Sequence, residues 1–108
     1  MDNQHKIIKG YRDLSQAELD MINDVESKGV ELAALIEKLR QSVNAEFQTA
    51  FVIQGEARGD EARAKADEQY RRVMASTAEA NRWIQIGQDH LQQGLMALTR
   101  AVARPENF

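Results

Sequence analysis

The chain has 108 residues and a formal net charge of −3, with 43% hydrophobic and 29% charged residues, a balance typical of one folded domain. It contains no cysteine, which excludes disulfides, iron–sulfur clusters, thiolate zinc sites and a cysteine nucleophile. Residues 1–54 carry 6 basic and 9 acidic side chains and residues 55–108 carry 8 of each, so neither half has the broad basic face that duplex nucleic acid requires. A small anion held by a few well-placed cations remains compatible with this balance.

The N-terminal segment, residues 1–14, lacks the apolar core of a signal peptide, and the apolar runs elsewhere are too short to span a membrane. We therefore expect a cytoplasmic protein with no membrane partner. The single proline, Pro105, stands near the C-terminus of a chain rich in helix-forming residues. An all-α fold in one domain, residues 1–108, is predicted.

A first long helix is expected over residues 15–57. Ser15 and Glu18 have the spacing of a capping box, in which each side chain accepts a hydrogen bond from the backbone amide of the other residue. One helical seam then follows at steps of three and four, through Ile22, Val25, Gly29, Leu32, Ile36, Leu39 and Val43. The polar stretch 54–60, with a glycine near each end, predicts a turn after this helix.

A second long helix is expected over residues 60–103, antiparallel to the first. One row of residues recurs at intervals of seven: Tyr70, Thr77, Ile84, Leu91 and Leu98. The row three positions further on is mostly small: Val73, Ala80, Gly87, Gly94 and Ala101. Each glycine inside a helix is unfavourable by about 1 kcal/mol relative to alanine. We interpret the small row as a surface on which another helix packs closely.

A two-helix hairpin buries one stripe on each helix and cannot also bury its other large apolar side chains. These are Phe47, Phe51, Tyr70, Met74, Trp83, Leu95, Met96 and Val102. We therefore expect copies of the chain to assemble into a homo-oligomeric helical bundle. On the residues alone, a structural or adaptor protein that binds no ligand explains this pattern as well as a binding protein does.

Catalytic and metal-binding patterns are not found in the sequence. Neither His5 nor His90 has a second histidine three or four residues away, and no serine lies in a nucleophile-elbow motif. We therefore expect no enzymatic activity, no metal site and no cofactor.

A few cations stand in positions that suit an anionic ligand. Tyr11 lies beside Arg12. An aromatic ring with neighbouring cations is the minimum needed to hold a nucleobase and its phosphate. The alternative is that Tyr11 covers the end of the hairpin. Arg82 adjoins the seam of the second helix, where it requires an anion or a carboxylate of another subunit. Lys28 is either a ligand contact or an exposed lysine paired with Asp24.

Two segments, "GYRDLSQAELDMINDVESKGVELAALIEKLR" and "NRWIQIGQDHLQQGLMALTRAVARP", together resemble the small phage anti-CBASS proteins that sequester cyclic oligonucleotides. That family shares its hairpin domain with the Thoeris anti-defence sponges. The resemblance spans residues 9–41 and 78–105, and residues 42–65 have no counterpart in it. It implies a short N-terminal helix and two long antiparallel helices, assembled as a hexamer. It also implies binding without hydrolysis of cyclic dinucleotides, such as 3′,3′-cyclic GMP–AMP, and of cyclic trinucleotides.

The resemblance also implies roles for individual residues. An aromatic residue of the N-terminal segment stacks on a base in that family, a role that falls here to Tyr11, with Arg12 beside it. A lysine of the first helix contacts phosphate, but Glu26 stands fifteen residues after Tyr11, so Lys28 is the nearest basic substitute. An arginine of the second helix enters a three-fold pocket for cyclic trinucleotides, and Arg82 is the candidate for it.

Overall fold

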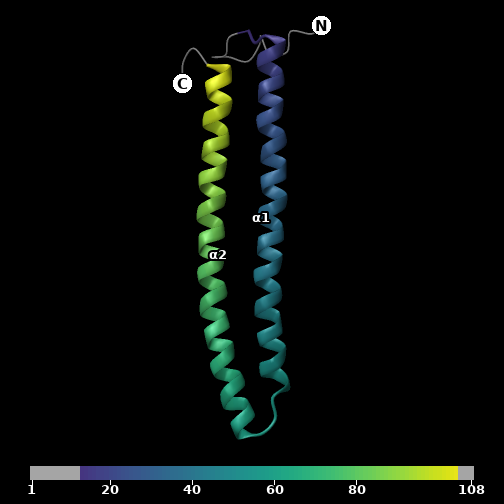
Figure 1. Cartoon of the computed structure of the whole chain (residues 1–108). Helices are drawn as coiled ribbons and strands as arrows, with labels where there is room; N and C mark the ends of the chain where they lie inside the picture. The colour runs from purple at the N-terminus through teal and green to yellow at the C-terminus, as the bar shows by residue number, and fades with distance from the viewer. Residues whose placement is uncertain (1–12, 105–108) are drawn as a thin grey trace. The chain divides into compact units, whose positions relative to one another are not determined.

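The computed structural model describes residues 13–104. Two helices, α1 (Gln16–Glu56, 41 residues) and α2 (Asp60–Ala103, 44 residues), are joined by a short turn into a hairpin (Figure 1). The described residues include no strand. The predictions of an all-α fold and of two long helices forming a hairpin are therefore confirmed. The expected N-terminal helical segment, residues 1–14, lies outside the described residues apart from Asp13 and Leu14.

The start of α1 has the predicted capping box. The backbone amide of Ser15 donates to Glu18 Oε1 at 2.9 Å, and the backbone amide of Glu18 donates to Ser15 Oγ at 3.1 Å. Two amides that have no acceptor within the helix are satisfied in this way. The local sequence therefore determines where the first helix begins.

Gly59 and Arg104 mark the two ends of α2. Gly59 has φ of +86°, a left-handed conformation that glycine adopts without steric penalty, and its carbonyl accepts from the amide of Arg63 at 3.0 Å. Arg104 has φ of +42°, and its amide donates to the carbonyl of Arg100 at 2.7 Å, which is the hydrogen bond of an αL C-cap. Pro105 follows in the sequence and disfavours helical geometry at the residue before it.

The contacts divide the chain into two units, which are described separately. The turn unit is Ala34–Gln88 and contains the loop between the helices. The terminal unit comprises Met1–Ala33 and Asp89–Phe108, of which residues 13–33 and 89–104 are described.

The turn unit packs small residues and an aromatic cluster between its two helical segments. Ala50 and Ala66 are 3% and 6% exposed. The rings of Phe47 and Phe51 in α1 lie 5.7 Å and 6.4 Å, centroid to centroid, from the ring of Tyr70 in α2. Tilted rings at this spacing add a favourable electrostatic contact to the apolar area that they bury. The aromatic cluster therefore holds the helices together near the turn.

Polar side chains also join the two helices of the turn unit. Arg40 Nη2 donates to Gln85 Oε1 at 3.0 Å and to Gln88 Oε1 at 2.6 Å. Closer to the turn, Gln54 Nε2 donates to Asp67 Oδ1 at 3.0 Å. These hydrogen bonds define which residues of α1 and α2 lie opposite each other.

The terminal unit packs more closely at one glycine. A Cβ at Gly29 of α1 would lie 3.3 Å from Leu95 Cδ1 of α2, so the glycine leaves room for the leucine side chain. Ala103 near the end of α2 is 2% exposed. Gly29 is therefore a contact position within the chain.

The seven-residue rows of α2 face α1 along only part of the helix. Thr77 in the turn unit is 5% exposed, whereas Leu91 and Leu98 in the terminal unit are 39% and 56% exposed. Because an α-helix has 3.6 residues per turn, a strict seven-residue row drifts by about 20° per heptad around a straight helix. Leu95 and Thr99, which are half-buried, take the inward positions in the terminal unit.

Many large apolar side chains remain exposed on the described part of the hairpin, and no large side chain is fully buried there. The most exposed are Val30, Met96, Trp83, Leu98 and Phe51, at 71%, 66%, 58%, 56% and 53%. Apart from its chain neighbours and the backbone of its own helix, a Cβ at Gly87 or Gly94 would have no atom of the described residues within 4 Å. Within residues 13–104, the small row of α2 therefore makes no close contact at these glycines.

Candidate functional site

The four residues proposed for ligand binding fall in different parts of the chain. Tyr11 and Arg12 lie outside the described residues. Lys28 belongs to the terminal unit and Arg82 to the turn unit, so each is described in its own surroundings.

Lys28 is an exposed residue of α1. Its Nζ lies 3.1 Å from Glu31 Oε2, one turn further along the helix, and the two side chains are 74% and 63% exposed. The expected alternative partner was Asp24, and the structure instead pairs Lys28 with Glu31. An exposed pair of this kind is worth about 0.2–0.5 kcal/mol, so the ammonium group is readily available to another anion.

Arg82 is an exposed residue of α2 with two neighbours on its own helix. Its Nη1 donates to Glu79 Oε1 at 3.2 Å, and both side chains are 58% exposed. Its Cζ lies 4.9 Å from the centroid of the Trp83 ring, which is also 58% exposed. The carboxylate partner of Arg82 therefore lies in the same chain. The cation and the indole together form an exposed surface suited to a planar or anionic group.

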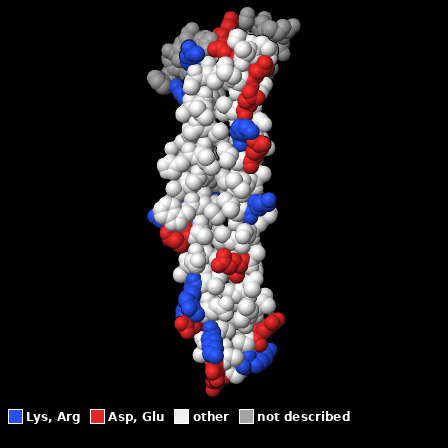
Figure 2. Space-filling model, viewed as in Figure 1, with Lys and Arg blue, Asp and Glu red and all other residues white. Residues whose placement is uncertain are grey.

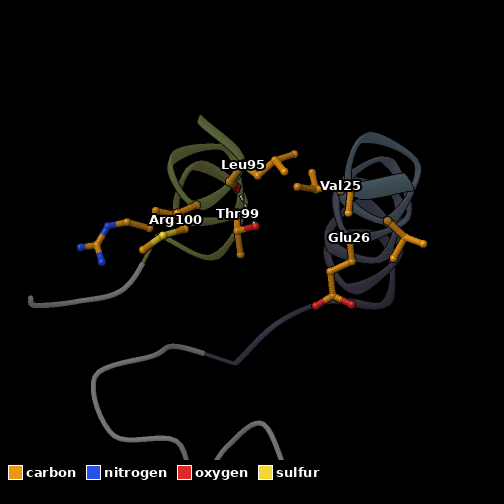
Figure 3. Close-up of a pocket in the computed structure, with 9 residues that line it drawn as sticks. Val25, Glu26, Leu95, Thr99 and Arg100 are labelled. Carbon is orange, nitrogen blue, oxygen red and sulfur yellow. Dashed lines mark hydrogen bonds between the residues drawn. The ribbon is translucent and has the colours of Figure 1, made fainter. Parts of the chain in front are cut away.

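A groove of about 520 Å³ lies between α1 and α2 in the terminal unit (Figure 3). Its walls are mainly aliphatic and include Val25, Gly29, Val30, Ala33, Leu95 and Met96. Figure 3 shows Val25 and Leu95 pointing toward each other from the two helices. A concave apolar surface with a few polar groups has the composition of a small-molecule site.

Three polar residues also line this groove, namely Glu26, Thr99 and Arg100. Thr99 Oγ1 donates to the carbonyl of Leu95 at 3.1 Å, so this hydroxyl is left with acceptor capacity. Figure 3 shows Glu26 on the α1 side and the guanidinium of Arg100 directed away from α1. Glu26 is therefore the acidic group of the groove, and Lys28 does not line it.

Comparison with known proteins gives the family. A family profile described as Acb2/Tad1, hairpin domain, matches residues 3–103. The chain is also 39% identical over 108 residues to Anti-CBASS protein 2 of Pseudomonas phage JBD67, with 98% of each chain covered. The chain belongs to the Acb2/Tad1 hairpin family. The match includes residues 42–65, for which the sequence resemblance had no counterpart.

The surface of this Acb2/Tad1 hairpin carries mixed charge. On the face shown in Figure 2, uncharged residues cover long stretches, and acidic and basic side chains lie near one another. Among residues 13–104, no group of three or more acidic, histidine or cysteine side chains is arranged to hold a metal ion. In the same range, no helix is both long and apolar enough to cross a membrane.

In the sequence, Glu26 stood out only by its distance from Tyr11, and no pattern predicted the groove. The signal for the groove was Gly29, a glycine inside an otherwise aliphatic seam. A missing side chain at such a position indicates either a close approach or a hollow. Here Leu95 approaches, and the hollow lies beside it.

Proposed function

We propose that this protein is a phage anti-CBASS protein that sequesters cyclic oligonucleotide second messengers and does not degrade them. It acts in the cytoplasm of the infected bacterium. The observation that carries the proposal is the 39% identity to Anti-CBASS protein 2 over 98% of both chains. Cyclic dinucleotides such as 3′,3′-cyclic GMP–AMP are the first ligand class, and cyclic trinucleotides are the second.

The binding unit that we propose is a homo-oligomer, with six copies as the expected number. Val30, Met96 and Trp83 are at least half exposed in the single chain. Burial of one such side chain contributes roughly 1.5–3 kcal/mol, which an isolated hairpin does not obtain. Association of several copies supplies this burial and also brings cations of different copies together.

The proposed ligand contacts come from both helices and from the N-terminal segment. Tyr11 stacks on a base, and Arg12 and Lys28 neutralise phosphate charge. Arg82, from several copies, binds a cyclic trinucleotide. An anionic ring is held in this way by stacking and charge-assisted hydrogen bonds, without a general base.

Calorimetry against a panel of cyclic dinucleotides and trinucleotides tests the proposal directly. We expect binding of at least one cyclic dinucleotide, followed by recovery of the intact compound when the protein is denatured by heat. Chromatography of the released material distinguishes the intact ring from a linear product. Absence of binding across the panel would refute the proposal, and a linear product would refute sequestration.

A structural or adaptor protein without a ligand is the alternative, because exposed apolar side chains and open glycines suit protein contacts equally well. Light scattering at micromolar concentration tests the assembly that both functions share. We expect no stable monomer. A monodisperse, cooperatively folded species of 12.2 kDa would refute the oligomer and the shared binding sites together.

A further inference from the structure

Arg40 is a half-buried cation between the two helices of the turn unit. Its Nη2 donates to Gln85 Oε1 at 3.0 Å and to Gln88 Oε1 at 2.6 Å, and both acceptors are neutral amides. Within residues 13–104, the guanidinium of Arg40 forms no ion pair with a carboxylate. A cation that is partly removed from water is usually paired with an anion, because neutral partners do not offset its charge. The charge of Arg40 is therefore not compensated within this part of the chain.

The two glutamines also fix the orientation of the guanidinium. Both hydrogen bonds use Nη2, so Nε and Nη1 keep N–H donors that no side chain of residues 13–104 accepts. A planar guanidinium with such donors suits a phosphate, which it contacts through two parallel N–H groups. Because the side chain of Arg40 is already ordered, binding of an anion costs little further side-chain entropy.

Polar groups on both helices adjoin Arg40. On α2, Gln85 lies three residues after Arg82, and residues at this spacing are neighbours on a helix surface. On α1, Asn44 lies four residues after Arg40 and lines a groove of about 300 Å³ together with Asn81 of α2. The other residues that line this groove are mainly apolar. An anionic ligand at Arg40 therefore has space beside it, and it lies next to the face of α2 that carries Arg82.

From these contacts we infer that Arg40 is a further ligand residue, which binds a phosphate group of the sequestered cyclic trinucleotide. The inference rests on the proposed function, and it adds a residue of α1 to the ligand contacts proposed for α2. Two donors of Arg40 contact the phosphate oxygens, and Gln85 and Gln88 act as positioning residues that hold the guanidinium in place. Each copy of the chain then contributes a cation from both helices to the anionic ring.

Calorimetry with cyclic tri-AMP tests this role on the full-length protein. Arg40→Gln removes the charge and retains an amide that can donate to the two glutamines, and circular dichroism verifies that it folds. We expect its affinity for cyclic tri-AMP to fall about tenfold or more, because charge-assisted hydrogen bonds are lost. Arg40→Lys keeps the charge without the planar fork of donors, so its affinity should lie between those of Arg40→Gln and the wild-type protein.

Lys38→Gln is the matched control, because it removes an exposed cation of α1 that forms no ion pair within residues 13–104. It should bind cyclic tri-AMP as the wild-type protein does. Undiminished affinity in Arg40→Gln, or an equal loss in Lys38→Gln, would overturn the inference. If the wild-type protein binds 3′,3′-cyclic GMP–AMP but not cyclic tri-AMP, the inference fails and sequestration of dinucleotides stands. Absence of binding to both compounds would overturn both.

The melting temperature of the protein without ligand distinguishes ligand binding from a contact between copies. If the anion at Arg40 is a ligand phosphate, the charge is uncompensated in the empty protein. Arg40→Gln should then melt at the same temperature as the wild-type protein or at a higher one. If a carboxylate of another copy pairs with Arg40 instead, Arg40→Gln should melt at a lower temperature, and light scattering should show a weaker oligomer. That result would overturn the ligand role.

Discussion

Substitution of Gly94 or Gly87 by alanine tests whether the small row of α2 packs against another copy. In the part of the chain that the structure describes, a Cβ at either position would have no atom within 4 Å beyond its chain neighbours and the backbone of its own helix. Alanine should therefore improve the helix by about 1 kcal/mol. For a chain of this size, that gain corresponds to a rise in melting temperature of roughly 4–8 °C.

If second helices of different copies meet at these glycines, alanine lowers the stability of the assembly instead of raising it. The added methyl group then overlaps atoms of the neighbouring copy, and overpacking of a close contact is unfavourable by about 1–3 kcal/mol. This loss exceeds or cancels the helix gain. We therefore expect each variant to have a lower melting temperature and a weaker oligomer than the wild-type protein.

Thermal melting and light scattering at matched concentrations measure both effects. Gly55→Ala is the control, because its Cβ also enters open space and the residue lies in α1, away from the small row. It should leave the oligomer unchanged and should not lower the melting temperature. If Gly94→Ala and Gly87→Ala behave like Gly55→Ala, close packing on the small row is refuted.

Two further substitutions test the N-terminal region. Tyr11→Ala should weaken cyclic dinucleotide binding by about 1–3 kcal/mol, because base stacking is lost, and should leave the oligomer intact. Unchanged affinity in calorimetry, or loss of the oligomer in light scattering, would contradict the ligand role. Ser15→Ala should lower the free energy of unfolding by about 1 kcal/mol, because the amide of Glu18 loses its acceptor. Urea unfolding measures this change. Ser27→Ala is the control, because Ser27 is exposed inside α1 and caps no helix end. Equal stability of the two variants would contradict a capping role for Ser15.

The features of the fold that sequence predicted depend on interactions close in the chain. The capping box requires only Ser15 and Glu18, and the turn requires a residue such as Gly59 that adopts positive φ. The inward face of α2 was less predictable, because a row spaced by seven drifts around the helix. Leu98 continues the row in sequence but is 56% exposed.

The candidate site was predictable in part. Lys28 and Arg82 were identified as cations on helices, but their partners depend on side-chain rotamers and on the choice between several nearby carboxylates. The structure selects Glu31 and Glu79. The groove depends on the alignment of two helices distant in sequence, so no local pattern placed Glu26 beside Leu95 and Thr99. The roles proposed for Tyr11, Arg12, Lys28 and Arg82 stay predictions.

Arg82→Ala separates a ligand role from a structural one, because the interactions of Arg82 within the chain are weak. An exposed pair with Glu79 is worth about 0.2–0.5 kcal/mol, and an exposed contact with the Trp83 ring about 0.5–1 kcal/mol. If Arg82 groups from several copies converge on a cyclic trinucleotide, they repel one another in the empty oligomer. Their removal should then abolish trinucleotide binding, spare dinucleotide binding and leave the empty oligomer nearly as stable as before.

Thermal melting of the oligomer measures both ligand binding and the stability of the empty oligomer. It is carried out with and without a cyclic trinucleotide, on the wild-type protein and on Arg82→Ala. Glu79→Gln is the matched control, since it removes the carboxylate partner and retains the guanidinium. Trinucleotide should stabilise Glu79→Gln at least as much as the wild-type protein, because a competing anion has been removed. A structural ion pair between subunits predicts instead that Arg82→Ala weakens the oligomer equally with and without ligand. Undiminished stabilisation of Arg82→Ala by the trinucleotide would refute its role in binding.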